Sequence, residues 1–239
     1  KLPAAHYLIV DRNQRADQST PVCYWNLADS FRKKRRFRSE EEAGEALREL
    51  IDDAVRMRMI SDVPLGAFLS GGIDSSTIVA SMARIVPPGD VCSFSAGFRE
   101  KSFNEIDEAR EVSHFLGVNH RDQYVLSETA SLLPQIAHYA DEPFADTSII
   151  PMYLLAEFAR RNVTVCLSGD GGDEIFAGYE TYLADKIHHL TRWLPRWATK
   201  GLSHAIEQWL PVSFGKVSLD YKLRQFLSGH ALDAPQIGR

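Results

Sequence analysis

The chain has 239 residues, of which 44% are hydrophobic and 25% are charged. These values are close to those of ordinary globular proteins, and they exclude a disordered, collagen-like or disulfide-scaffold chain. With 27 basic and 32 acidic residues, the formal net charge is -5, so no overall positive field gathers nucleic acid or an anionic membrane surface. We therefore expect neither of these partners.

The cysteines and the apolar stretches indicate the cellular setting in which the protein is expected. Three cysteines stand far apart among apolar neighbours: Cys23, Cys92 and Cys166. Such a set is unlike a disulfide framework or a zinc cluster, so a reducing, cytoplasmic setting is expected. The most apolar stretch, residues 148–159, is interrupted and is shorter than the ~20 residues of a membrane span. We find no signal-peptide pattern at the start of the sequence. Because the first residue is Lys1 and not Met, we interpret the chain as a piece of a longer protein.

The first segment, residues 1–38, predicts two short strands followed by a basic linker. The patterns at 6–10 and 22–25 favour strands. Two strands alone do not make a stable sheet, so we interpret them as the trailing strands of an absent domain, with an arm packed on the present domain as the alternative. The basic run at 32–38 is followed directly by three glutamates, which lie within a Debye length of ~10 Å and favour a solvated linker over a nucleic-acid patch.

The second segment, residues 39–239, has the sequence pattern of an α/β domain. Ser39 and Glu42 have the spacing of a capping box at the start of a helix. Strand-like and helix-like segments then alternate at 65–69, 75–84, 91–95, 105–115, 121–125, 128–139, 151–160, 163–167 and 173–187. This alternation predicts an α/β fold with a doubly wound, mainly parallel sheet flanked by helices. Ligands of such sheets bind at the carboxyl ends of the strands, where the chain turns into the next helix.

The turn at 70–76 joins a predicted strand to a predicted helix and contains two glycines, three serines and Asp74. Adjacent glycines expose backbone amides, the hydroxyls add donors, and the helix N-terminus carries partial positive charge. This combination predicts a cradle for a polyanion. A carboxylate beside phosphate is repulsive unless a hard cation lies between them, so we interpret Asp74 as a magnesium ligand. The alternative is an N-cap aspartate beside an empty anion-binding turn.

The turn at 168–174 has the same placement with more negative charge. It holds three glycines together with Asp170, Asp173 and Glu174. Three neighbouring carboxylates repel one another unless a cation or an ammonium-bearing substrate balances them. The alternative is a solvated acidic turn that caps a helix.

Three ordered blocks of sequence resemble known families. The first, Ser70-Gly71-Gly72-Ile73-Asp74-Ser75, is similar to the S-G-G-x-D-S pyrophosphate loop (PP-loop) of the N-type ATP pyrophosphatases. The second, LSGDGGDEIFAGY at 167–179, resembles the corresponding segment of the asparagine synthetase family. The third, DEPFADTSIIP at 141–151, resembles the middle block of that family. The resemblance extends over about residues 3–227.

The resemblance implies an adenine nucleotide alpha hydrolase-like fold and specific roles for residues. It assigns ATP binding to Leu69, Ser70, Gly71, Gly72, Asp74, Ser75, Ser76, Ala96, Ser168 and Gly169. The backbone of Leu69 and of Ala96 would contact adenine. Asp74 and Asp173 would bind Mg²⁺. Glu142 is the candidate general base for ammonia, with a structural carboxylate in the loop before Pro143 as the alternative.

The activity that the resemblance implies is an AMP-forming amide ligase of the glutamine-dependent asparagine synthetase type. ATP would adenylate the side-chain carboxylate of aspartate, and ammonia from an N-terminal glutaminase domain of the parent protein would form the amide. A homodimer is left open. Because the family's essential lysine lies beyond the segment present here, we expect the isolated chain to be inactive. The alternatives are a related amidotransferase with another carboxylate acceptor and a non-catalytic nucleotide-binding module.

Overall fold

The computed structural model describes residues 2–11, 19–97, 104–125, 130–140, 144, 146 and 148–191. The chain divides into two compact units, residues 1–50 and residues 51–239. The domain boundary expected from sequence, after residue 38, stays a prediction. No helix within the described ranges is long and apolar enough to cross a membrane.

The first unit contains the two predicted strands, and they are short. Strands β1 (His6–Tyr7) and β2 (Val22–Cys23) pair in antiparallel register. Helix α1 (Leu27–Arg32) was not predicted, because its six residues run into the basic segment that we interpreted as a linker. At the start of helix α2 (Glu40–Arg58), one half of the predicted capping box is present, since the amide of Glu42 donates to Ser39 Oγ at 3.3 Å. The Glu42 carboxylate accepts from the amide of Arg38 at 2.8 Å, where a capping box has the amide of Ser39.

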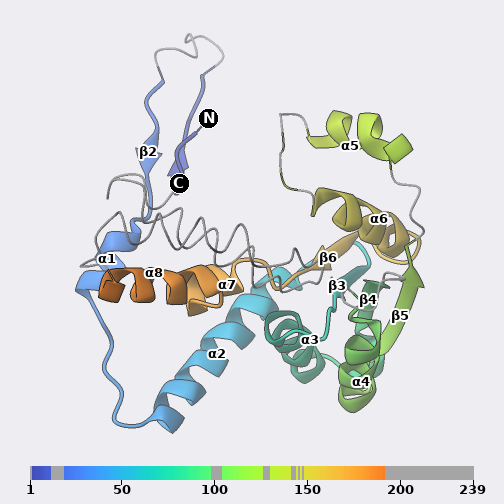
Figure 1. The fold of residues 1–239 in the computed structure, drawn as a ribbon, viewed down its shortest axis with the longest axis horizontal. Coiled ribbons are helices and arrows are strands. Elements are labelled where there is room, and N and C mark those ends of the chain that lie inside the picture. Colours follow the sequence, from blue (N-terminus) through green and yellow to red (C-terminus); the bar gives the residue numbers. More distant parts are fainter. Residues whose placement is uncertain are drawn as a thin grey trace, which may run out of the picture. The chain divides into compact units, whose positions relative to one another are not determined.

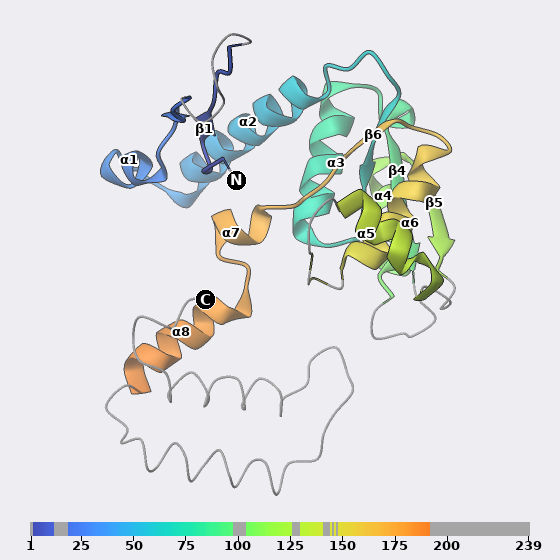
Figure 2. The same ribbon diagram turned by 90° about the horizontal axis from the view of Figure 1, so that it is seen from above.

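The second unit alternates strands and helices close to the predicted ranges. After the end of α2 come β3 (Leu65–Phe68), α3 (Ile73–Ile85), the 3-10 turn η2 (Pro88–Asp90), β4 (Cys92–Gly97), α4 (Ile106–Leu116), β5 (Asn119–Tyr124), the 3-10 turn η4 (Ala130–Leu132), α5 (Leu133–Ala140), α6 (Ile149–Arg160), β6 (Val165–Leu167), α7 (Gly172–Phe176) and α8 (Glu180–Thr191). Figure 2 shows α5 beside α6, in agreement with their contacts.

Four of the described strands form one parallel sheet in the order β5-β4-β3-β6 (Figure 1). β3 lies between β4 and β6, with Ala67 opposite Ser93 on one side and Leu167 on the other. The chain therefore builds the sheet outward in one direction through β4 and β5, and then crosses back to add β6 on the other side of β3. This arrangement confirms the predicted parallel α/β sheet.

Helices pack on both faces of this sheet, and successive strand residues point to the two faces in turn. On one face, Val79 and Met82 of α3 pack around Ala67 and Leu69. On the other face, helix α6 supplies Ala159 and Phe158, and the ring of Phe158 meets that of Phe94 edge-on with centroids 5.9 Å apart. The sheet therefore lies between two layers of helices (Figure 1).

The prediction of one helix over 173–187 was wrong. The structure has two helices, α7 and α8, separated at Ala177 and Gly178. Ala177 adopts a left-handed backbone conformation with φ of 56°, and the amide of Gly178 donates to the Asp173 carbonyl at 3.0 Å. A left-handed residue followed by such a bond ends a helix, so the chain leaves α7 after five residues.

Candidate functional site

A cavity of about 650 Å³ lies at the carboxyl ends of β3, β4 and β6. β3 and β6 are the neighbouring strands at which the order of the sheet reverses, which is where open α/β sheets bind ligands. The turn after β3, the turn after β6, the end of β4 and the first two turns of α6 all contribute to the lining. The fold therefore brings both turns singled out from the sequence to one cavity.

The turn after β3 is held in shape by its own hydroxyl groups. The amide of Ser70 donates to Ser75 Oγ at 3.1 Å, and the two serine hydroxyls lie 2.9 Å apart. The amide of Gly72 donates to Ser70 Oγ at 3.2 Å. Gly71 has φ of 80°, and a Cβ there would lie 2.6 Å from Cβ of Glu108, so glycine is required for both conformation and space.

Helix α3 presents donors beside this turn. Its N-cap residue is Gly72, and no side chain caps the helix. The amides of the first helical turn, residues 73–75, have no acceptor within the helix. The hydroxyl oxygen of Ser76 is buried and has no hydrogen-bond partner among the described residues. Uncompensated donors and a buried hydroxyl at a helix N-terminus suit an anion.

The second turn packs directly against the first through two glycines. A Cβ on Gly169 would lie 2.7 Å from the amide nitrogen of Ser75. A Cβ on Gly172 would lie 2.5 to 2.8 Å from the carboxylate atoms of Asp74. Real Cβ atoms do not approach so closely, so a side chain at either position would force the backbone of the first turn or the Asp74 carboxylate to shift.

Two acidic residues of the second turn, Asp170 and Glu174, accept hydrogen bonds from hydroxyl groups. Ser168 Oγ donates to Asp170 Oδ2 at 2.9 Å, and Tyr179 Oη donates to Glu174 Oε1 at 2.7 Å. The bond to Glu174 raises the pKa of Tyr179 to about 12. No ion pair between described residues neutralises Asp170, Asp173 or Glu174. The turn thus keeps an excess of negative charge at the cavity.

A magnesium ion would need ligands from outside the protein here. In the described part of the chain, no three His, Cys, Asp or Glu side chains are arranged to hold a metal ion by themselves. Asp74 and Asp173 both line the cavity. Mg²⁺ typically binds through one or two carboxylates together with substrate phosphates and water. Two carboxylates beside a donor-rich turn fit that mode, whereas they do not fit a cage built from protein alone.

The sequence-predicted residues fall into three groups. Those that line the cavity are Leu69, Ser70, Asp74, Ser75, Ala96, Ser168, Gly169 and Asp173. Gly71, Gly72 and Ser76 belong to the same turn and helix start without lining the cavity. Glu142 lies outside the described residues. The structure therefore brings most of the predicted nucleotide site together, while the predicted base has no described position.

Sequence reasoning missed one wall of the cavity and one hydrogen-bonded pair. Ser148, Pro151, Met152 and Leu155 line it from the start of α6, and Ser95 and Tyr179 line it elsewhere. The apolar residues of α6 carry no signal of their own, because the same spacing packs a core. Tyr179 was within the quoted motif, and its pairing with Glu174 depends on the unpredicted break before α8.

Comparison with known proteins assigns the family. The model of the asparagine synthase family matches residues 46–234. The chain is 43% identical to asparagine synthetase [glutamine-hydrolyzing] 1 of Bacillus subtilis. That match covers 60% of this chain and 22% of the Bacillus protein. The chain is 38% identical to putative asparagine synthetase [glutamine-hydrolyzing] 2 of Methanocaldococcus jannaschii. That match covers 82% of this chain and 37% of the Methanocaldococcus protein. The chain thus spans well under half the length of these relatives.

Among solved structures, the chain is similar to NH3-dependent NAD synthetase from Campylobacter jejuni. The TM-score is 0.39 at 16% sequence identity, and the match covers 56% of this chain and 60% of the other.

Proposed function

This chain belongs to the asparagine synthase family, and we propose that it forms the ATP-binding part of a glutamine-dependent, AMP-forming amide ligase. The observation that carries the proposal is the direct contact between the two glycine-rich turns at one cavity. Gly169 lies against Ser75 and Gly172 lies against Asp74. A turn rich in donors and a turn rich in carboxylates therefore lie side by side, and this supports a site in which one metal-bound polyphosphate would contact both.

In this proposal the nucleotide lies along the carboxyl ends of β3 and β4. The backbone of Leu69 and Ala96 contacts adenine, and both residues line the cavity. The turn at 70–76 and the first amides of α3 hold the phosphates. Support comes from the start of α3, which has no side-chain cap, and from the buried hydroxyl of Ser76, for which the described residues offer no hydrogen-bond partner. Ser168 and Gly169 complete the pocket from the opposite turn.

Asp74 and Asp173 are the proposed magnesium ligands. Bound Mg²⁺ supplies charge neutralisation for the phosphates and for the departing pyrophosphate. The protein holds the two carboxylates in place from both turns, because Asp74 lies against Gly172 and Asp173 lies against Gly178. Their excess negative charge, unpaired by any described cation, favours a ligand that brings positive charge.

The proposed chemistry has two steps. A carboxylate oxygen of the acceptor attacks the α-phosphorus of ATP, the bond to the β-phosphate oxygen breaks, and pyrophosphate leaves. Ammonia then attacks the acyl carbon of the adenylate, AMP departs with the electron pair of the broken bond, and a proton passes from the nitrogen to a base. We assign the base to Glu142. Amide donors of the first turn stabilise charge on the leaving pyrophosphate.

Aspartate is the proposed acceptor, and glutamine the nitrogen source. The two relatives described above carry the name asparagine synthetase [glutamine-hydrolyzing], which supports both assignments. A glutaminase domain elsewhere in the parent protein is the proposed supplier of ammonia, and a homodimer is the proposed assembly. The three free cysteines, Cys23, Cys92 and Cys166, support a reducing, cytoplasmic setting.

Product analysis of the longer parent protein tests the reaction. With glutamine, aspartate and Mg-ATP, the proposal predicts AMP and pyrophosphate in amounts equal to asparagine. Formation of ADP and phosphate would show that the carboxylate is activated by phosphorylation instead. If pyrophosphate appears only with another carboxylate, the amide-ligase chemistry holds and the acceptor assignment fails. If no acceptor supports pyrophosphate release while Mg-ATP still binds, the non-catalytic alternative replaces the enzyme.

A further inference from the structure

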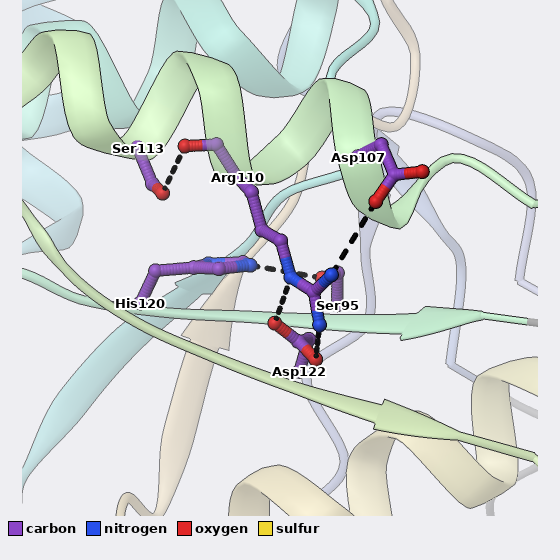
Figure 3. A network of polar contacts seen from close by, with 6 residues as sticks. All are labelled: Ser95, Asp107, Arg110, Ser113, His120 and Asp122. Atoms are coloured by element: carbon purple, nitrogen blue, oxygen red, sulfur yellow. Dashed lines mark hydrogen bonds and ion pairs between the residues drawn. The ribbon is translucent and has the colours of Figure 1, made fainter.

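A histidine on β5 bridges two buried serines on β4, and Figure 3 shows its ring together with one of them, Ser95. His120 lies directly opposite Ser93 in the parallel pairing of the two strands. Its Nδ1 is 2.9 Å from Ser93 Oγ, and its Nε2 is 3.0 Å from Ser95 Oγ. The serines are 0% and 4% exposed, so their hydroxyls are largely removed from water. Both ring nitrogens are therefore used inside the protein.

Charged groups around this histidine are themselves paired. The guanidinium of Arg110 on α4 donates to both carboxylate oxygens of Asp122 at 2.8 Å, and it also donates to Asp107 at 3.3 Å (Figure 3). Burial lowers the pKa of His120, Asp122 acts to raise it and Arg110 to lower it. The structure thus favours the neutral ring, in which one nitrogen donates and the other accepts. One serine then donates to the ring while the other accepts from it.

One member of this network also belongs to the candidate site. Ser95 lines the cavity, as does the next residue, Ala96, at the end of β4. Ser93, two residues earlier on the same face, does not line it. The adjacent backbone is tied to β3, since the amide of Leu69 donates to the Phe94 carbonyl at 2.9 Å. The bond from His120 to Ser95 therefore reaches the wall that the proposed function assigns to adenine.

We propose that His120 is a positioning residue for the nucleotide base: by holding the Ser95 hydroxyl, it fixes the end of β4 against which adenine lies. This inference rests on the proposed ATP function. It predicts that loss of the Ser95 bond weakens binding of the nucleoside part of the ligand and leaves binding of the phosphate part unchanged. Loss of the Ser93 bond alters stability only.

Two substitutions of His120 separate these bonds. An asparagine amide reaches about as far as Nδ1 and can still meet Ser93, whereas a glutamine amide reaches about as far as Nε2 and can still meet Ser95. We expect His120→Asn to weaken Mg-ATP binding by about three- to tenfold, the value of one hydrogen bond, and His120→Gln to bind like wild type. Ser95→Ala should bind like His120→Asn, and Ser93→Ala should bind like wild type.

The readout is the dissociation constant of three probes with the 239-residue chain, measured by calorimetry or by competition. The probes are Mg-ATP, adenosine and Mg-pyrophosphate. His120→Asn and Ser95→Ala should weaken Mg-ATP and adenosine by the same factor and leave Mg-pyrophosphate unchanged. Equal affinities for the asparagine and glutamine variants would overturn the inference. So would parallel losses for adenosine and pyrophosphate, because they would indicate general loss of structure.

Failure of the inference and failure of the proposed function give different patterns. Asp74→Ala should weaken Mg-ATP and Mg-pyrophosphate while leaving adenosine unchanged. If Asp74→Ala behaves in this way and His120→Asn has no effect, the ATP site stands and the role of His120 is refuted. If the wild-type chain binds none of the three probes, the proposed function fails, and the inference fails with it.

Discussion

At the scale of single residues, Gly172 leaves the space in which the carboxylate of Asp74 lies. A Cβ at this position would lie 2.5 Å from Cγ and 2.6 Å from Oδ2 of Asp74. The Gly172→Ala variant should therefore push the carboxylate out of place and weaken Mg-ATP binding by about 10- to 100-fold, as displacement of a metal-ligand support commonly does. The unfolding temperature should change little, because the backbone at Gly172 is not in the left-handed region.

Gly89→Ala is the matched control, since a Cβ on Gly89 meets nothing within 4 Å. Calorimetry with Mg-ATP on both variants measures the difference. Equal affinities would mean that the contact between the two turns does not position Asp74.

Ser76 allows binding and folding to be separated. Its buried hydroxyl has no hydrogen-bond partner among the described residues, so removing it breaks no hydrogen bond that the structure describes. Ser76→Ala should keep or raise the unfolding temperature, because alanine is the better helix former. It should also weaken Mg-ATP binding if the hydroxyl contacts phosphate.

Ser81→Ala, on the same helix, is the control, since it should lower stability and leave Mg-ATP binding unchanged. Ser81 Oγ donates to Asp52 at 2.5 Å, and losing that bond should cost about 1–2 kcal/mol of stability without altering affinity.

Thermal unfolding and Mg-ATP titration of the two serine variants give the test. A Ser76→Ala variant that is destabilised and binds normally would reverse the assignment.

At the scale of elements, the β4–β5 pair should make stability depend on pH. Burial lowers the pKa of His120 in the folded chain, so the unfolded chain binds a proton first as the pH falls. The neutral ring contributes fully to the free energy of unfolding above the ordinary histidine pKa of about 6.5. This contribution is lost as the pH falls through the lower pKa of His120 in the folded chain. Asp122 does not titrate in this range, because Arg110 holds its pKa below the usual value.

Urea unfolding of wild type and His120→Gln at pH 8 and pH 5.5 measures this effect. The free energy of unfolding of wild type should fall relative to that of the variant at the lower pH. The burial of a neutral ring would be contradicted if the two proteins kept the same difference in free energy of unfolding at both pH values. It would also be contradicted if wild type became more stable relative to the variant at pH 5.5.

The element boundaries show where local sequence signals were sufficient. The helices at 75–84 and 105–115 were predicted because apolar side chains recur at helical spacing. They appear as α3 and α4 with shifts of one or two residues. The break between α7 and α8 was missed because the left-handed turn is at Ala177, a residue that favours helix. The preference of the following glycine for turns was the available signal.

At the scale of the whole molecule, the sequence predicted two ligand-binding turns but not their contact. Each turn has its own local signal in glycines, hydroxyls and carboxylates. Their adjacency depends on β6 pairing with β3 rather than with β5, which is a long-range choice that no local pattern specifies. The α6 wall was likewise unpredicted, since Met152 and Leu155 have the pattern of ordinary core residues.

The central claim is that the two turns form one site for Mg-ATP. Calorimetric titration of Mg-ATP into the 239-residue chain tests it most directly, beside Asp74→Asn and Asp173→Asn, which come from different turns. The claim predicts one saturable site in wild type and a loss of about tenfold or more in each variant, because either carboxylate is one of the few protein ligands to the metal. Absence of saturable binding, or a loss in only one of the two variants, would contradict a site shared by both turns.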